Sequence, residues 1–465
     1  MTDPADPTNR DTRATLRAAW DEFIAELQRA RDAIDHPELM PPPASDRVLA
    51  EGYRYLMGFV HSGVERAFFE DARFPFVRHA LQLINKGTID NADAIYFMAP
   101  IDGHESYVLR GRVADHRHWR GAIPAPAGRL APRYLIFELS DGCIAGDSGS
   151  LTELRPGVKV QTGKLDSTEF EVDTSGCFEI LLAPERPAGH TGNFIATLKR
   201  SKRPEHSDRY ACWVSGRQLF CDWEREDPAP LTLEQLGAEG GHPHPYDADT
   251  AAAQLRRMGS LVRGQMHFWN EFNTVLLETH GKRDGGGGGG DRFMPRNAFN
   301  RPNAASRETG GGQSTNIYAG GVFELEPDEA LIVESRVAVE PQYTGFHLAN
   351  LWGESLDFAN HQSSLNGCQS EVDADGVRRL VIAHGDPGIA NWIDTTGQRE
   401  GYMAARWAYS TQPPQDNWPV ISATKIRFDE IRRHLPPHVR SISAEQRADA
   451  IRIRREHVLR RYRVF

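Results

Sequence analysis

Cysteine is scarce in this sequence. The 465 residues include five cysteines, an odd number, and none of them forms a C-x-x-C pair. They are Cys143, Cys177, Cys212, Cys221 and Cys368. This usage indicates neither a disulfide framework nor a cysteine-based zinc site. We therefore expect reduced thiols in a cytoplasmic protein.

Long apolar runs and an excess of positive charge are also missing. No run approaches the roughly 18 residues that a membrane span needs, and the N-terminus lacks the basic and apolar regions of a secretory signal. The net charge is −10 at pH 7, which disfavours nucleic acid and anionic membranes as partners. We expect a soluble protein with no nucleic-acid and no membrane partner.

Common catalytic signatures are absent as well. The motif "GDSGS" (146–150) resembles the segment around a trypsin-like nucleophile, but Ser150 replaces Gly and no upstream His has a matching context. The Gly-rich run within 281–314 lacks the G-K-[ST] ending of a P-loop, so it is predicted to be a linker and not a phosphate cradle.

Metal-binding patterns are weak. His242 and His244 lie close to Asp247, but the prolines between and after them favour an extended linker. No H-E-x-x-H motif or Cys/His set supports zinc. We expect no bound metal and no tightly bound cofactor.

Helical periodicity is present in three stretches, and a capping pattern marks a fourth helix. Apolar residues recur at helical spacing in residues 11–35, 45–70 and 250–279, and a capping-box pattern at Ser443 and Gln446 opens an Arg-rich final segment. In the first stretch the predicted buried stripe is Leu16, Trp20, Phe23, Leu27 and Ile34. The final segment is predicted to be a solvated face with salt bridges to an acidic body or, as an alternative, a docking arm for an acidic partner or a second subunit.

Short β-type segments fill the rest of the chain. They are rich in β-branched and aromatic residues and end at Gly, Asp, Ser or Pro, which is typical of antiparallel sandwiches or jelly rolls. We predict a mainly β, α+β fold with two sandwich units and flanking helices. The predicted regions are an N-terminal helical region (1–85), a first β-sandwich (86–235), a helix and Gly-rich linker (236–314), a second β-sandwich (315–425) and a C-terminal Arg-rich helical segment (426–465).

The two strand regions resemble each other. Residues 171–183 align with 371–383 without a gap, and five of the thirteen positions are identical. Tyr96 corresponds to Tyr318, and "YLIFEL" (134–139) corresponds to "YTGFHL" (343–348), in the same order along the chain. We interpret this as an internal duplication.

Three blocks also resemble a known family. They are "DNADAIYFMAPIDGHESYVLRGR" (90–112), the "VDTSG…GNFI" block and the "DPGIANWIDTTG…GYMAARW" block that ends at Trp407. Together they are similar to the DUF1214 family of bacterial proteins, often found beside or fused to DUF1254. The resemblance covers about half the chain. It implies antiparallel β-sandwich folds and no established activity.

One loop differs between the two predicted copies. The second copy has His384, Asp386 and Asp394 where the first has Pro184, Arg186 and Ala196. A His with two carboxylates within reach can perform general acid–base catalysis. These three residues are the candidate catalytic set, and the alternative is a polar turn whose Asp residues cap backbone N–H groups.

Other polar residues are candidates for ligand binding. Amide-rich strands can bind sugar hydroxyls, and tryptophan or arginine can stack on a ring or hold an anion. The candidates are Asn360, His361, Asn366, Asn391, Trp392, Arg406, Arg110 and Arg112. An exposed strand face is the structural alternative for these segments.

We therefore hypothesise a cofactor-independent enzyme, a hydrolase or lyase, that acts on a carbohydrate-like or other polar small molecule in a cleft between two sandwich units. The alternative is a non-catalytic ligand-binding or assembly protein that forms a homo-oligomer through the C-terminal helix.

Overall fold

The computed structural model describes residues 7–35, 45–142, 149–155, 157–203, 205–281, 294–304 and 312–462. In this part of the chain five sheets and a few helices form a mainly β, α+β structure, as the sequence predicts. Most of the Gly-rich run, most of "GDSGS" and Cys143 lie outside the described residues.

The first strand set contains two main sheets. Its strands alternate apolar and polar positions, so one face of each sheet is apolar, and Phe97, Leu109, Phe137 and Ile180 from the two sheets meet in one buried cluster. In spatial order one sheet is β1 (Arg78–Leu81), β2 (Ala94–Pro100), β10 (Trp213–Leu219), β4 (Tyr134–Ser140) and β5 (Gln161–Asp166). The other sheet is β11 (Leu231–Gln235), β3 (Tyr107–Arg112), β6 (Cys177–Ala183) and β7 (Asn193–Ala196). A small additional sheet pairs β8 (Leu198–Lys199) with β9 (Arg209–Tyr210).

The second strand set also contains two sheets, and its core includes Phe323, Leu331, Phe346, Leu380 and Trp407. In spatial order one sheet is β12 (Asn316–Glu324), β18 (Glu400–Ala408), β14 (Tyr343–Ala349) and β15 (Ser364–Asn366), and the other is β17 (Trp392–Asp394), β16 (Arg378–Ala383), β13 (Glu329–Arg336) and β19 (Val420–Arg427).

The strand order is the same in the two sets. The order β2-β10-β4-β5 matches β12-β18-β14-β15, and β11-β3-β6-β7 matches β19-β13-β16-β17. The pairs β6–β7 and β16–β17 are both parallel. Registers agree too, because Arg217 lies opposite Tyr96 and Arg406 lies opposite Tyr318.

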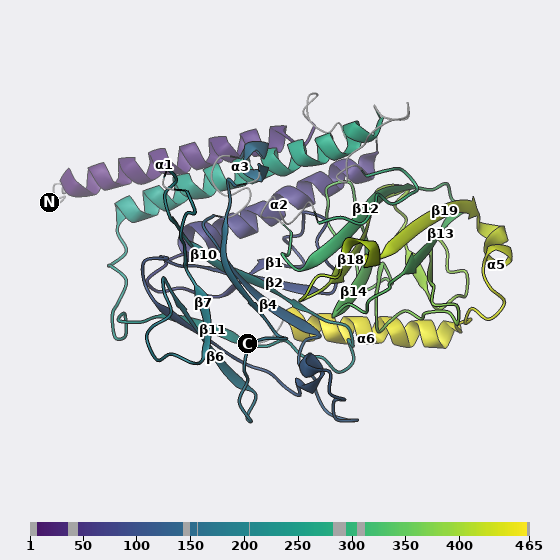
Figure 1. The fold of residues 1–465 in the computed structure, drawn as a ribbon. Coiled ribbons are helices and arrows are strands. Elements are labelled where there is room, and N and C mark those ends of the chain that lie inside the picture. Colours follow the sequence, from purple (N-terminus) through teal and green to yellow (C-terminus); the bar gives the residue numbers. More distant parts are fainter. Residues whose placement is uncertain are drawn as a thin grey trace.

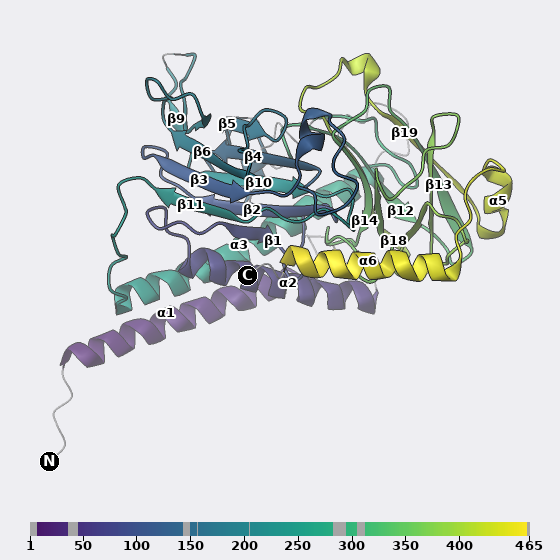
Figure 2. The ribbon, with the colours of Figure 1, turned by 90° about the horizontal axis from the view of Figure 1, so that it is seen from below.

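Helices cover two sides of the strand sets. On one side lie α1 (Pro7–Asp32), α2 (Asp46–Phe68) and α3 (Ala248–Gly281), as Figure 1 shows. On another side α6 (Ala444–Tyr462), which follows the short α5 (Ile431–His434), runs along the second strand set toward the first (Figure 2). None of the described helices is long and apolar enough to cross a membrane.

The apolar stripe of α1 is only partly covered. Phe23 and Ile34 are buried against α2, α3 and Trp352. The prediction that Trp20 is buried is wrong, because 52% of its surface is exposed. Helical periodicity identifies an apolar face but not how far a neighbour extends along it.

The space between the two strand sets is filled by packed side chains. Tyr134, Ile136 and Leu219 from the first set form a buried cluster with Tyr343 and Ala408 from the second. Two tyrosine contacts cross the boundary in opposite directions: the Tyr134 hydroxyl lies 3.3 Å from Thr315 Oγ1, and the Tyr343 hydroxyl donates to Asp93 Oδ2 at 2.6 Å. Packed side chains thus occupy this part of the boundary, where the sequence predicts a ligand-binding cleft.

A disulfide also crosses this boundary. Cys221, which follows β10, is bonded to Cys368, which follows β15, with 5.3 Å between their Cα atoms. The expectation of reduced thiols is therefore wrong for this pair. It failed because the two cysteines are 147 residues apart in sequence, and their proximity depends on the tertiary fold. The cytoplasmic location remains a prediction.

Candidate functional site

The strongest candidate site is a histidine–carboxylate pair in the second strand set. Asp394, the last residue of β17, places Oδ2 2.8 Å from His361 Nδ1. Its other oxygen, Oδ1, accepts a hydrogen bond from the backbone N–H of Thr396 at 2.7 Å. Both residues are among the predicted candidates, but the sequence assigned them different roles and did not pair them.

The pair has one buried side and one accessible side. The side chain of Asp394 is 13% exposed and that of His361 is 44% exposed. Because Asp394 holds Nδ1, the remaining ring nitrogen is Nε2, and it has no hydrogen-bond partner among the described residues. A carboxylate behind one imidazole nitrogen fixes the tautomer and stabilises the protonated ring.

Backbone hydrogen bonds hold the two residues of the pair in place. The N–H of Asp394 donates to the carbonyl of Gln362 at 2.8 Å. The buried side-chain amide of Gln362 donates in turn to the carbonyls of Ala390 and Trp392. The loop carrying His361 is thereby fastened to β17.

The turn after Asp394 has a strained backbone. Thr396 has a φ of 52°, in the left-handed region that non-glycine residues seldom occupy. Arg47 of α2 donates to the Thr396 carbonyl at 3.1 Å. Residues held in such conformations cluster at functional sites, so the position of Thr396 beside the pair supports this candidate.

His384 and Asp386 do not join Asp394 in one catalytic set. His384 has both ring nitrogens engaged, Nδ1 with the Thr395 hydroxyl at 2.7 Å and Nε2 with the Leu325 carbonyl at 3.1 Å. Asp386 receives two hydrogen bonds from Arg447 of α6 and one from the N–H of Gly388. The two predicted catalytic carboxylates therefore lie in separate turns with separate partners.

Asn391 and Trp392 have contacts that explain their presence structurally. The Asn391 amide donates to the carbonyls of Glu371 and Arg379 and accepts from the N–H of Glu371. Asn193 makes the same three bonds with the backbone of Glu171 and Glu179. Trp392 is buried, and its indole N–H donates to the Ala383 carbonyl.

Asn360 and Asn366 lie on either side of His361 in sequence but have separate surroundings. Asn360 is bonded to Asp357 and to Arg455 of α6. Asn366 is fully buried and donates to Asp93 Oδ1 at 2.8 Å. Burial raises the pKa of the Asp93 carboxyl, and this contact belongs to the boundary between the strand sets.

The three predicted arginines lie apart from the His361–Asp394 pair. Arg406 is buried at the boundary, where it contacts His347 and the Ile89 carbonyl. Arg110 is on an open strand face, ion-paired with Glu179 at 2.6 Å and with Glu234 at 2.5 Å. Arg112 is exposed at the end of β3.

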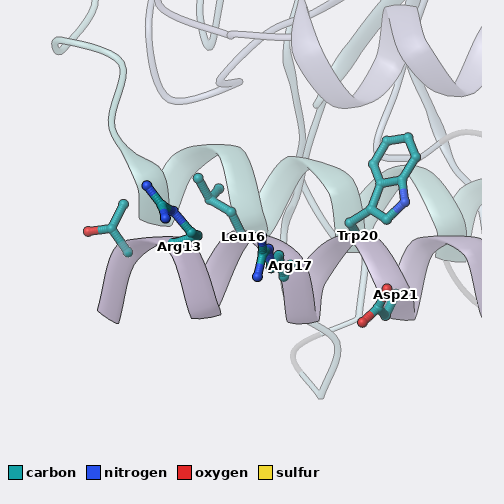
Figure 3. A pocket seen from close by; sticks show the side chains of 6 residues that line it. Arg13, Leu16, Arg17, Trp20 and Asp21 are labelled. Carbon is teal, nitrogen blue, oxygen red and sulfur yellow. The ribbon is translucent and has the colours of Figure 1, made fainter. Parts of the chain in front are cut away.

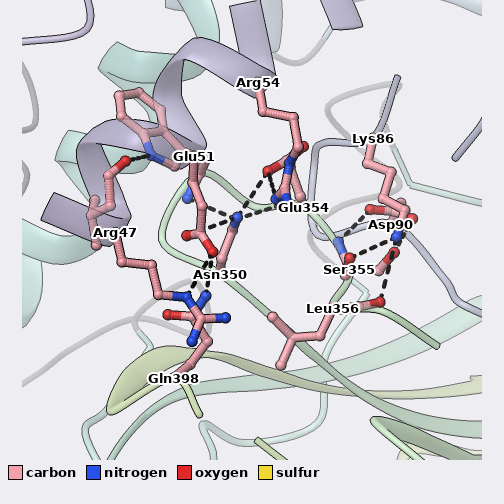
Figure 4. A network of polar contacts seen from close by, with 12 residues as sticks. Arg47, Glu51, Arg54, Lys86, Asp90, Asn350, Glu354, Ser355, Leu356 and Gln398 are labelled. Atoms are coloured by element: carbon pink, nitrogen blue, oxygen red, sulfur yellow. Dashed lines mark hydrogen bonds and ion pairs between the residues drawn. The ribbon is translucent and has the colours of Figure 1, made fainter. Parts of the chain in front are cut away.

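A buried polar network lies between α2 and the loop after β14 (Figure 4). The Asn350 amide donates to Glu354 at 2.8 Å and to Glu51 at 3.3 Å, so one amide bridges two buried carboxylates. Gln398 and Arg47 also donate to Glu51, and Arg54 pairs with Glu354 at 2.6 Å. Arg47 thus connects this network to the Thr396 turn.

The sequence contains a signal for this network that the residue pattern analysis missed. Glu51 lies three residues after Val48 and eight before Phe59, on the same face of α2 as these two apolar residues. A charged residue on an apolar face is unusual, since a buried charge needs partners. Its partners come from the second strand set and have no local sequence signature.

The segment before β2 also has a strained backbone. Thr88 and Ile89 have φ values of 62° and 53°, and Ile89 is β-branched. Next to them, Lys86 donates to the Ser355 carbonyl at 2.9 Å, and Asp90 accepts from the Ser355 hydroxyl at 2.7 Å (Figure 4). Burial lowers the pKa of the Lys86 ammonium group. These contacts fasten the first strand set to the loop after β14.

Metal binding has no support in the described part of the chain, where no group of three or more His, Cys, Asp or Glu side chains is arranged to hold an ion. His242 and His244 are both exposed.

Comparisons with known proteins give a fold and no activity. No family model and no curated protein sequence matches the chain. A solved structure of an uncharacterised protein from Burkholderia cenocepacia matches with a TM-score of 0.68 and 24% identity, over 90% of this chain and 99% of that one. A Vibrio parahaemolyticus protein matches with a TM-score of 0.39 and 11% identity, over 86% of this chain and 100% of that one. At this identity the first likeness shows the fold alone.

Proposed function

We propose that the chain is a tandem duplication of one β-sandwich and that the second copy has acquired an acid–base site. The duplication is supported by the common strand order and by side chains repeated at matched positions. Asn193 and Asn391 make the same bonds, and the hydroxyls of Tyr96 and Tyr318 each accept the N–H of the residue five positions earlier.

The His361–Asp394 pair carries the functional proposal. Residues that both copies need for folding should occur in both, as the two asparagines do. The pair occurs only in the second copy, because Ala196 is matched to Asp394 through the equivalent pairing of β7 with β6 and of β17 with β16. A residue pair confined to one copy is therefore better explained by function than by the fold.

In the proposed mechanism His361 is the general base. The Nδ1–H group of His361 donates a hydrogen bond to the Asp394 carboxylate, which leaves the Nε2 lone pair free to take a proton from a substrate hydroxyl or a water molecule. The imidazolium ion that forms is stabilised by the carboxylate 2.8 Å away. Proton return from Nε2 to a leaving group would complete hydrolysis or elimination, so a hydrolase or lyase acting on a carbohydrate-like or other polar small molecule is the proposed class.

A panel of chromogenic glycosides and esters, together with polar hydroxy acids, tests the proposal on the purified full chain. We expect turnover of at least one class. His361→Gln and Asp394→Asn should each lower kcat/KM by about 10²–10⁴-fold, while the exposed His206→Gln variant should behave like the wild type. Activity that is unchanged in both His361 and Asp394 variants would refute the assignment.

Binding of a panel compound without turnover would favour the alternative, a non-catalytic ligand-binding protein. The assembly alternative through α6 has less support, because the described arginines of α6 all have partners within the chain. These are Arg447, Arg452, Arg454, Arg455, Arg460 and Arg461.

A further inference from the structure

The outer face of α1 carries an uncovered aromatic side chain. Trp20 is 52% exposed and lies at a shallow hollow of about 540 Å³. Figure 3 shows this hollow, which is lined by Thr12, Arg13, Leu16, Arg17, Trp20 and Asp21, all on α1. The apolar stripe of α1 thus continues past the point at which the rest of the chain covers it.

The charges around Trp20 differ from those on the rest of α1. Toward α3, Glu22 pairs with Arg256 and Glu26 pairs with Arg263, both at 2.6 Å. By contrast, Arg17 and Asp21 form no ion pair with any residue that the structure describes. They are exposed, and they lie four residues apart on one face of the helix, one before and one after Trp20 along the chain.

We propose that this face of α1 binds the same face of a second copy of the chain, with the two helices antiparallel about a two-fold axis. In such an isologous contact, residues at equal distances from the axis meet their counterparts. An axis at the level of Ala19 places Arg17 opposite Asp21 of the second copy, and the reverse, which forms two ion pairs. Trp20 then packs on the partner helix, where its exposed ring loses contact with water.

The size of the contact sets the expected strength. A pair of single helices buries less area than the 1,200–2,000 Å² or so of a standard stable interface. The dimer should therefore be weak and depend on concentration, with its binding energy concentrated in the tryptophan. This inference does not depend on the proposed acid–base site.

Charge reversal gives a decisive test by sedimentation equilibrium of the full chain over a wide concentration range. We expect the wild type to dimerise, and Trp20→Ala, Arg17→Glu and Asp21→Arg each to weaken association by about tenfold or more. The exposed Arg112→Glu variant, which makes an equal charge change elsewhere, should dimerise like the wild type. Circular dichroism should show unchanged helix content in every variant.

Mixing the two reversed variants separates contacts between chains from contacts within α1. Arg17→Glu has two acidic groups and Asp21→Arg has two basic groups at the proposed contact, so only a mixed dimer restores both ion pairs. We expect the mixture to associate more strongly than either variant alone. A wild type that is monomeric at all concentrations, or a mixture that associates no better than its components, would overturn the proposal.

Discussion

At the residue scale, burial determines the charge state of key groups. Glu226 is buried beside the Cys221 end of the disulfide, and its carboxyl accepts the N–H groups of Cys221 and Arg133. Desolvation raises the pKa of Glu226 from 4.5 to about 8. Since none of the described cationic side chains is bonded directly to it, the neutral acid is the form that the fold accommodates best.

The effect of pH on stability follows from this shift. The folded-state pKa of Glu226 lies above its unfolded value, so protonation contributes its full stabilisation below about pH 4.5 and loses it as pH rises through about 8. Glu226→Gln keeps a neutral acceptor at this position. We expect the difference in unfolding free energy between the variant and the wild type to grow by roughly 3 kcal/mol, in favour of the variant, from pH 5 to pH 8.

Urea unfolding at several pH values measures this difference, and the exposed Glu205→Gln variant is the control. If the difference between Glu226→Gln and the wild type does not change with pH, Glu226 is not neutral in the folded state and the prediction fails.

Residue-level predictions from sequence named residue types but not the pair that the fold brings together. The sequence selected His361 and Asp394 as chemically capable groups, but they are 33 positions apart, and only the tertiary fold brings them together. His384 and Asp386 were equally suitable in type, yet each is engaged by the backbone or by α6. Residue identity limits what a side chain can do, whereas its partners determine whether that capacity is free.

At the element scale, α6 is a polar helix whose buried arginines connect the two strand sets. Arg454 is 2% exposed, donates to Phe358 and Ser364, and lies over the Trp223 ring. Arg461 is fully buried and donates to the Ala92 carbonyl of the first strand set. The Arg-rich composition predicted a solvated face, but the long side chains instead reach carbonyl groups of both strand sets.

Two arginines of α6 give a matched comparison. Arg454→Ala leaves buried carbonyls unpaired and removes packed methylene groups, so we expect a loss of about 3 kcal/mol or more in unfolding free energy. Arg452→Ala removes only exposed ion pairs within the helix, for which we expect little or no change in unfolding free energy. Chemical denaturation measures the unfolding free energy of both variants. Equal losses would show that the buried Arg454 does not stabilise the contact of α6 with the strand sets.

The elements themselves were largely predictable from the sequence. Alternating apolar residues predict the strands, helical spacing predicts α1, α2 and α3, and a capping-box pattern predicts α6. The exposed Trp20 shows where this method stops, because periodicity defines a face without identifying its neighbour. Burial of Glu51 was missed for the same reason, since Asn350 and Gln398, which hold it, come from distant segments.

At the scale of the whole molecule, the disulfide is a covalent link between the two strand sets. Replacing both Cys221 and Cys368 by Ser removes a cross-link that closes a long loop, which typically costs about 2–5 kcal/mol. We expect a lower urea midpoint for this double variant and an unchanged midpoint for the exposed Cys177→Ser control. Peptide mapping without reductant should also recover the two segments as one linked species. A midpoint equal to that of the wild type would contradict a stabilising bond.

The two crossed tyrosine contacts have a consequence for the history of the chain. Tyr134 and Tyr343 occupy matched strand positions. Tyr134 reaches Thr315, three residues before Tyr318, and Tyr343 reaches Asp93, three residues before Tyr96, the counterpart of Tyr318. A solitary ancestral module would have carried tyrosine and acceptor on one face, and so would have been self-complementary. The proposed duplication therefore implies that the present boundary derives from the subunit interface of a homodimer, whose two chains gene fusion would have joined into one polypeptide.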